Sequence, residues 1–231
     1  MIGSIDMSSA QGKGQPPRDK QTRTERTKRD EILAAAIARF SRDGYENTKW
    51  ADVAVDVGVG PTALYHYFDS KQHCLFVILD DAIREALARF DRITADEPHF
   101  ELALQLVVAD AFDLTVLDIE RLRVLVAEHG LLARRHSSPE GQHTKQAARA
   151  RTRDLERAWT TFLERAMDAG AVSKSDPRLL ARAVLGLYNS IWHWYRPQGS
   201  IPLEVVSTFY GTKLLELISA EPSLSEGLRV A

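Results

Sequence analysis

The side chains with the most evident chemistry gather in one short stretch, Thr48 to Lys71, which reads TKWADVAVDVGVGPTALYHYFDSK. Apolar residues at helical spacing break at Gly58 and Gly60, restart at once, and end in four consecutive rings at positions 65–68. A short helix, a glycine turn and a second short helix form the helix-turn-helix motif, whose second helix lies in the major groove of DNA. The alternative is two helices of an ordinary bundle, because such hairpins also occur in proteins that never contact DNA.

A row of arginines is a second candidate site. Within the helix expected at 144–169, three arginines recur at a spacing of four, namely Arg149, Arg153 and Arg157. Such a row can hold the phosphate of a ligand, since guanidinium groups bind phosphate oxygens in pairs. The alternative is a solvated helix face on which neighbouring acidic residues balance the charge.

The histidines give little support to metal or catalytic chemistry. His129 lies among apolar residues of the helix expected at 119–136 and points either into a cavity or into the core. His136 and His143 flank a Ser-Pro-Gly loop and have no acidic third ligand close in the sequence, so no metal site is predicted. The chain has no glycine-rich phosphate loop, nucleophile elbow or metalloprotease motif. We therefore expect no enzyme and no cofactor, with an all-α enzyme that uses His129 or His193 as an alternative.

Helical periodicity runs through the rest of the chain, and no stretch alternates convincingly as a strand. The first helix is expected from Asp30 to Gly44, Thr48 is the predicted N-cap of a second, Pro61 opens a third, and a fourth follows Ser70. Further helices are expected at 99–118, 119–136, 144–169, 177–195 and 203–219. The predicted fold class is all-α, with about nine helices.

Composition divides the chain into three parts. Residues 1–26 are rich in Gly, Ser, Gln and Pro and are expected to form a disordered basic arm, followed by helical domains over 27–87 and 88–231. Residues 1–29 hold seven Lys or Arg against three Asp or Glu, although the whole chain carries a net charge of −2. Arg26 and Arg29 can enter a minor groove or follow phosphates; the alternative is a solvated tail.

The protein is expected to be cytoplasmic and to have no membrane partner. Its one cysteine, Cys74, excludes an intrachain disulfide and fits a reducing compartment. No apolar run approaches the length of a membrane span, and the N-terminus lacks the apolar region of a secretion signal.

From Arg26 to about Ala86 the chain resembles the N-terminal domain of TetR-family transcriptional regulators. The likeness rests on ILAAAIARFSRDGYENT, then VAVDVGVGPTALYHYF, then Ser70 and Lys71, in that order. Two departures are Gly60, where many members have Ser, and Trp50, an unusually large side chain near the start of the second helix. The resemblance implies a three-helix DNA-binding domain over 27–87 and a ligand-binding, dimerising domain over 88–231.

The resemblance also implies which residues meet DNA. It places six residues on or beside the reading helix: Pro61, Thr62, Ala63, Tyr65, His66 and Tyr67. Thr62 can bond a base edge or a phosphate, Ala63 can contact a thymine methyl, and the tyrosine hydroxyls can reach phosphates. Thr48, Lys49 and Lys71 are expected phosphate contacts, with Trp50 beside them, whereas Phe68 is expected in the core.

The implied function is a ligand-responsive repressor that binds double-stranded DNA at an inverted repeat as a homodimer. The dimer would form through the helices at 177–195 and 203–219. Seven residues are candidate walls of a site for a hydrophobic small molecule: Phe112, Leu125, His129, Trp159, Phe162, Tyr188 and Trp192.

The stretch NSIWHWYRPQGSIP also resembles TetR-family regulators of fatty-acid and steroid degradation, several of which respond to acyl-coenzyme A (acyl-CoA) thioesters. An acyl-CoA inducer, with Arg153 and Arg157 on its phosphates, is therefore one hypothesis. Another hydrophobic inducer, or none, is the alternative. A structural protein that coats DNA without sequence preference is an alternative function, and the sequence does not distinguish repressor from activator.

Overall fold

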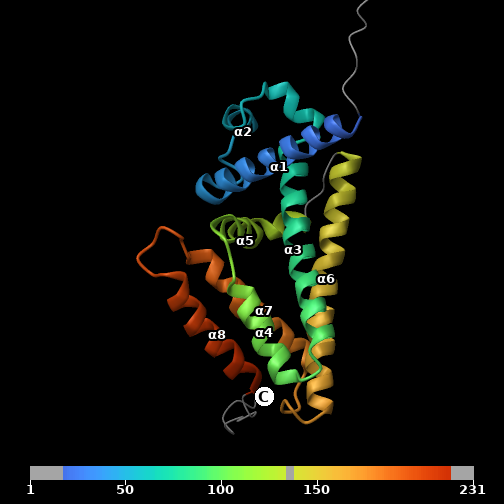
Figure 1. Cartoon of the computed structure of the whole chain (residues 1–231), viewed down its shortest axis with the longest axis vertical. Coiled ribbons are helices and arrows are strands. Elements are labelled where there is room, and N and C mark those ends of the chain that lie inside the picture. The colour runs from blue at the N-terminus through green and yellow to red at the C-terminus, as the bar shows by residue number, and fades with distance from the viewer. Residues whose placement is uncertain (1–17, 134–137, 220–231) are drawn as a thin grey trace, which may run out of the picture.

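The computed structural model describes residues 18–133 and 138–219, and every regular element within them is helical, which confirms the all-α prediction (Figure 1). Eight α-helices and two short 3-10 helices make up this part of the chain. In order they are α1 (Arg18–Asp43), α2 (Trp50–Asp56), η1 (Pro61–His66), α3 (Lys71–Asp96), α4 (Phe100–Phe112), α5 (Val116–Glu128), η2 (His129–Ala133), α6 (Pro139–Asp168), α7 (Pro177–Trp194) and α8 (Leu203–Ser219).

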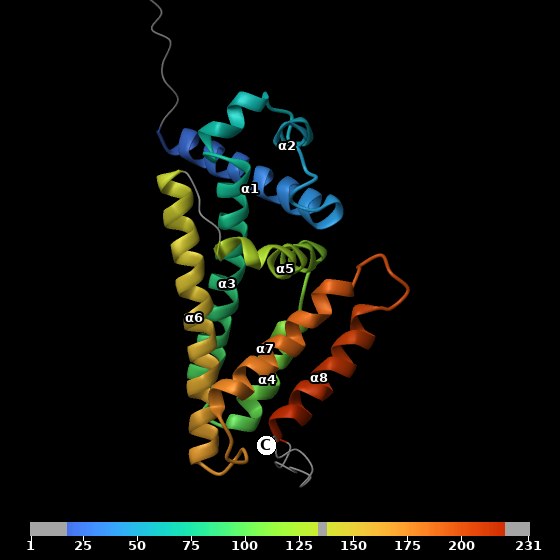
Figure 2. The ribbon, with the colours of Figure 1, turned by 180° about the vertical axis from the view of Figure 1, so that it is seen from behind.

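Two hydrophobic clusters hold these helices together. The upper cluster joins α1, α2 and η1 to the first turns of α3, with α5, η2 and α6 completing it. The lower cluster joins the end of α3 to α4, α6, α7 and α8. Figures 1 and 2 show α1 and α2 at one end, and α3 and α6 side by side along the length of the molecule. The contact between α3 and α6 is the most extensive in the structure, so this pair is the spine of the fold.

Local hydrogen bonds explain where the helices begin and end. The Ser70 hydroxyl accepts from the backbone N–H of His73 at 3.0 Å and starts α3. Thr115 and Asp118 form a reciprocal capping box that starts α5. Asp176 accepts from two backbone N–H groups at the start of α7.

Gly58 closes α2 with a φ of +66°, and the N–H of Val59 donates back to the carbonyl of Ala54 at 3.0 Å. This is the Schellman arrangement, which needs the left-handed backbone that glycine adopts without strain. The predicted glycine turn of the helix-turn-helix is therefore correct in its backbone geometry.

Several predicted boundaries are wrong. Helix α1 begins at Arg18 rather than near Lys28, so residues 18–26 are not disordered; the rest of the predicted arm lies outside the described residues. Extending an existing helix costs little, and this segment is rich in Arg, Lys, Gln and Glu, which favour helix. The helix expected at 99–118 stops at Phe112, because the capping box at Thr115 starts a new one. The third helix is a 3-10 turn rather than an α-helix.

The remaining helices agree better with the sequence. α7 and α8 match their predicted ranges to within one residue, whereas α6 begins at Pro139, five residues earlier than expected, with Ser138 as its cap. Within the described ranges, no helix combines the length and apolar character needed to cross a membrane.

The glycine turn gives a direct test of the backbone argument. Gly58→Ala should lower the free energy of unfolding by about 1 kcal/mol, because a Cβ strains the left-handed backbone even where space is free. Gly60→Ala is the matched control: its φ is −68° and nothing lies within 4 Å of an added Cβ. The control should stay within about 0.5 kcal/mol of the parent protein in urea denaturation followed by circular dichroism. Equal losses in both variants would contradict the argument.

Candidate DNA-binding surface and ligand cavity

The reading helix is held from below and open above. Leu64 is fully buried and Phe68 is 1% exposed, so both ends of η1 are anchored in the upper cluster, as predicted for Phe68. Thr62 and His66 are exposed, and the Tyr65 side chain is 56% exposed. The anchors place polar side chains on a rigid base at the end of the molecule, which suits a contact surface.

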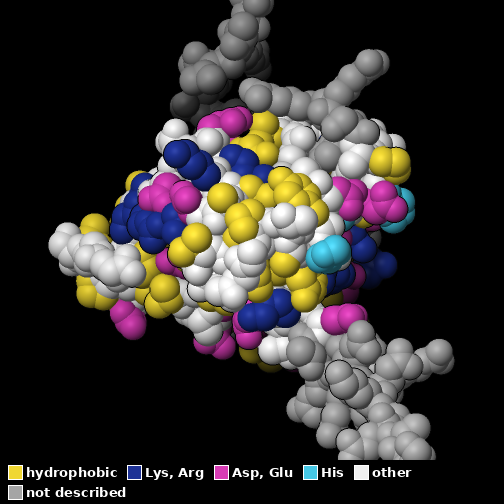
Figure 3. Space-filling view, turned by 90° about the horizontal axis from the view of Figure 1, so that it is seen from above, with side chains coloured by type: hydrophobic (Ala, Val, Ile, Leu, Met, Phe, Trp, Pro, Cys, Tyr) yellow, Lys and Arg dark blue, Asp and Glu magenta, His cyan; other side chains and the backbone are white. Residues whose placement is uncertain are grey.

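The face that carries α1 and α2 is uncharged at its centre and basic around it. In Figure 3, hydrophobic and uncharged side chains occupy the middle of this face, and Lys and Arg side chains lie at several points around them. The acidic residues of α2 are neutralised locally: Arg39 pairs with Asp56 and lies 3.6 Å from Asp52. The hydrogen bond from Arg39 holds the pKa of Asp56 below its usual range. The surface can therefore approach phosphates without strong repulsion from α2.

The predicted DNA-contact residues divide into three groups. Lys49, Pro61, Thr62, Tyr65, His66 and Arg26 are exposed, and Trp50, Ala63, Tyr67, Lys71 and Arg29 are partly exposed. Thr48 is 4% exposed. The structure thus brings the η1 residues together on one surface, and it separates from them several residues that the sequence placed at the phosphates.

Thr48 and Lys71 are used inside the protein, contrary to the predicted phosphate contacts. The Thr48 hydroxyl donates to the carbonyl of Gly44 at 2.8 Å, and Lys49 rather than Thr48 is the N-cap residue of α2. The Lys71 ammonium donates to the carbonyls of Tyr45 at 2.7 Å and Thr48 at 2.8 Å, and it lies 4.2 Å from the centre of the Tyr45 ring. Burial lowers the pKa of Lys71. Together these contacts fix the turn between α1 and α2.

Two more predicted contacts serve the core. The Arg29 guanidinium lies over the Phe68 ring, 5.0 Å from its centre. The Trp50 ring packs edge-on against Phe68 at 6.3 Å, and its indole nitrogen is buried with no acceptor among the described residues. Both side chains therefore hold η1 in place from beneath. A large aromatic residue at the start of α2 and a basic residue in α1 gave no sequence signal for this inward direction.

A cavity of about 260 Å³ lies within the helical body below the reading head. All six helices from α3 to α8, together with η2, contribute to its lining, which is mostly apolar. Four of the predicted wall residues line it: Leu125, His129, Trp159 and Tyr188. Burial lowers the pKa of His129, so its ring is neutral at pH 7 and can both donate and accept a hydrogen bond.

Charged residues also reach the cavity, and all but one were missed by the sequence reasoning. Arg89 donates to Asp110 at 2.8 Å, and both residues line the cavity with Asn189. Glu156, first read as part of a solvated face, lines the cavity and accepts from Arg178 and Arg182 of α7. A charged residue inside the apolar stripe of α3, such as Arg89, was the available signal.

Other predicted ligand residues lie elsewhere. Phe112, Phe162 and Trp192 pack behind the lining, with Phe162 edge-on to Trp159 at 6.2 Å. Arg153 and Arg157 are exposed and outside the lining, and Arg157 donates to Asp154 at 2.9 Å. The predicted phosphate row is therefore on the wrong side of α6 for this cavity. Among residues whose positions are described, no three His, Cys, Asp or Glu side chains gather as a metal site.

Two family models match the chain. The model for bacterial regulatory proteins of the tetR family matches residues 32–78, and the model for the tetracyclin repressor-like C-terminal domain matches residues 117–218. The KstR2 transcriptional repressor of Rhodococcus jostii is 24% identical over 205 residues, which cover 87% of this chain and 96% of that protein.

Solved structures give the same result. The TetR-family regulator PfmR of Thermus thermophilus has a TM-score of 0.66 at 26% identity, over 80% of this chain and 97% of that one. The regulator FadR of Bacillus subtilis, solved in complex with stearoyl-CoA, has a TM-score of 0.64 at 19% identity, over 82% of this chain and 97% of that one. With a helix-turn-helix at one end, a lined cavity in the body and both family models matched in order, the chain belongs to the TetR family of transcriptional regulators.

Proposed function

We propose that this regulator is a repressor that binds a palindromic operator as a dimer and is released when a hydrophobic small molecule enters the cavity. The carrying observation is the combination of η1, anchored by Leu64 and Phe68 and open at Thr62 and Tyr65, with an apolar cavity in the same chain. The long helix α3 belongs to both regions, so occupation of the cavity can alter the reading head.

The other candidate functions have less support. A protein that coats DNA without sequence preference needs no ligand cavity. An enzyme that uses His129 or His193 lacks support from relatives, which are regulators; His129 lies at the cavity, and His193 lies exposed on α7. DNA as the partner places the working protein in the cytoplasm.

The DNA contact is tested first at Thr62. If its hydroxyl bonds a base edge, Thr62→Ala should reduce the preference for the operator over random DNA by about 1–3 kcal/mol, with binding to random DNA nearly unchanged. Selection from random DNA should first yield an inverted repeat, and fluorescence anisotropy with both DNAs then measures the ratio. Thr208→Ala, on an exposed threonine of α8, is the control and should leave the ratio unchanged. Selection that returns no shared sequence would contradict specific binding.

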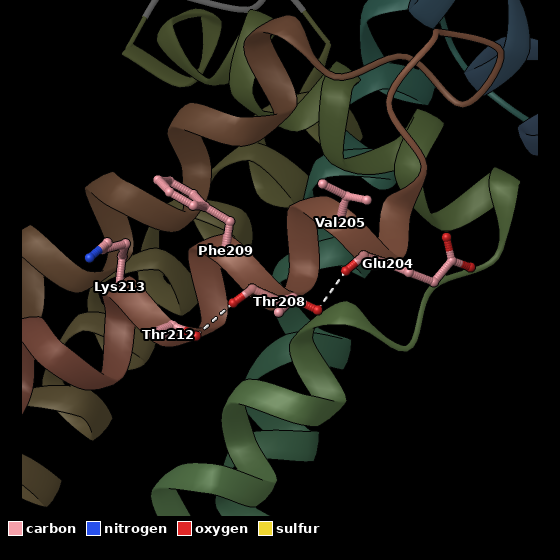
Figure 4. Close-up of a pocket in the computed structure, with 6 residues that line it drawn as sticks. All are labelled: Glu204, Val205, Thr208, Phe209, Thr212 and Lys213. Carbon is pink, nitrogen blue, oxygen red and sulfur yellow. Dashed lines mark hydrogen bonds between the residues drawn. The ribbon is translucent and has the colours of Figure 1, made fainter.

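The dimer surface is proposed on α7 and α8. Val205 and Phe209 of α8 are 57% and 59% exposed, and Leu179 and Trp194 of α7 are 62% and 43% exposed. Figure 4 shows Val205 and Phe209 projecting from α8 beside two threonines. Thr208 and Thr212 donate their hydroxyls back to carbonyls four residues earlier, each at 2.8 Å. These hydroxyls are satisfied within the helix, so the face is less polar than its sequence suggests.

Phe209→Glu should convert the dimer to a monomer at micromolar concentration, because two copies of a charge would meet near the two-fold axis. Val116→Glu is the control, since Val116 is 53% exposed at the start of α5, where an acidic side chain is favourable. Sedimentation velocity measures both. A parent protein that sediments as a monomer, or an unchanged Phe209→Glu dimer, would contradict this interface.

The size of the cavity limits the inducer. A cavity of about 150 Å³ holds benzene, so 260 Å³ accommodates roughly ten non-hydrogen atoms. An acyl-CoA, the class named for the FadR structure, would place only its acyl chain inside this volume. We keep acyl-CoA as the first hypothesis and another small hydrophobic molecule as the alternative.

A chain-length series separates these hypotheses. Release of the operator by acyl-CoAs should strengthen up to chains of roughly ten carbons, and free coenzyme A should be inactive. Leu125→Trp, which fills the cavity, should weaken release about tenfold, whereas Leu117→Trp, on the same helix but outside the lining, should not. If no thioester acts in an anisotropy titration of the protein–DNA complex, the acyl-CoA hypothesis is wrong, and other hydrophobic molecules are tested next.

A further inference from the structure

Arg123 of α5 connects three helices through one side chain. Its Nε donates to the Ser41 hydroxyl at 3.0 Å, and its Nη2 donates to the Ser41 carbonyl at 3.1 Å. Its Nη1 donates to the Tyr195 carbonyl at 2.6 Å. Ser41 lies in the last turn of α1, and Tyr195 is the C-cap of α7. One guanidinium therefore joins the reading head to a helix of the proposed dimer surface.

The chemistry of these contacts suits a rigid connection. Both backbone acceptors lie at helix C-termini, where carbonyls lack partners within the helix and carry a partial negative charge that a cation stabilises. The planar guanidinium holds its N–H groups in a fixed fork, so it can satisfy separate acceptors in one orientation. Tyr195 is 3% exposed, which limits competition from water at that end.

The same helix also forms a wall of the cavity. Leu122, Leu125 and Val126 line the cavity, and Arg123 lies among them in the sequence but reaches α1 and α7. Figures 1 and 2 both show α5 crossing the molecule between α1 and the end of α7. A small displacement of α5 would therefore act on both ends of the Arg123 contacts at once.

We propose that Arg123 is the positioning residue that fixes the reading head relative to the α7 end, and so sets the distance between the two reading heads of the dimer. This inference rests on the proposed dimeric, operator-binding function. It assigns the control of half-site spacing to Arg123, which lies outside both the DNA surface and the cavity lining.

Spacing selectivity tests the assignment without any inducer. Arg123→Met keeps most of the side-chain length and removes the three hydrogen bonds. Its affinity for a single half-site should match that of the parent protein. Its affinity for the full palindrome should fall about tenfold, and its discrimination against operators lengthened or shortened by one base pair should weaken, because mobile heads lower the effective concentration of the second site.

Arg121→Met is the matched control. Arg121 lies on the same helix and donates to Glu85 of α3 at 2.5 Å, so it ties α5 to α3 rather than to α1. It should keep the spacing selectivity of the parent protein. Arg123→Lys should recover part of the selectivity, since a single ammonium cannot bond all three acceptors in one orientation. Unchanged spacing selectivity in Arg123→Met, or equal loss in Arg121→Met, would overturn the proposal.

A distance measurement tests the same contact without DNA. Spin labels on Lys49→Cys and Gln198→Cys, both exposed, report the reading head against the α7–α8 loop, and Cys74 is buried. Measured by pulsed electron resonance in excess unlabelled protein, the distance distribution should broaden in Arg123→Met and not in Arg121→Met. Equal widths would overturn the proposal. A protein that binds no palindrome would instead contradict the proposed function, while this measurement still decides the role of Arg123.

Discussion

The continuity of α3 is the constraint on which the rest of the structure depends. Its first turns are buried in the upper cluster, and Phe90 is buried in the lower one, so a single rigid helix belongs to both. Three ionic contacts at successive turns tie it to its neighbours: Asp80 to Arg151 of α6, Glu85 to Arg121 of α5, and Arg89 to Asp110 of α4. Side chains that line the cavity and side chains that support the reading head are therefore parts of the same helix, and a displacement of its lower part is carried to its upper part.

The reading head shows how a small DNA-binding unit is made rigid. Several basic and polar residues near DNA are used for internal contacts: Lys71 holds the turn before α2, and Arg29 covers the ring of Phe68. This arrangement leaves the exposed residues of η1 on a fixed base. Arg123 continues the same principle one layer below, because it holds the end of α1 by its backbone and not by its surface. Rigidity at both levels is what an inverted-repeat site requires of two separated heads.

The cavity combines an apolar lining with charges that are already paired. Arg89 is held by Asp110, and Glu156 is held by two arginines of α7, whose hydrogen bonds lower its pKa. These pairs leave the cavity without an isolated charge among its lining residues, which suits a ligand whose buried part is neutral. The arginines proposed for phosphate binding lie on the outer side of α6, so a phosphate-bearing ligand would need other partners.

The sequence by itself determined what depends on neighbours a few residues apart. Helical periodicity gave the all-α class, Ser70 marked the start of α3, and Gly58 marked the turn of the helix-turn-helix, because caps and left-handed glycines act through local hydrogen bonds. The tertiary structure alone decided where long side chains point. Lys71, Trp50 and Arg29 turn inward, and Arg157 turns away from the cavity, because their partners lie on other helices or depend on how each helix is rotated in the bundle. Residue spacing along one helix carries no information about that rotation, and so neither the cavity lining nor the contacts of Arg123 could be read from the sequence.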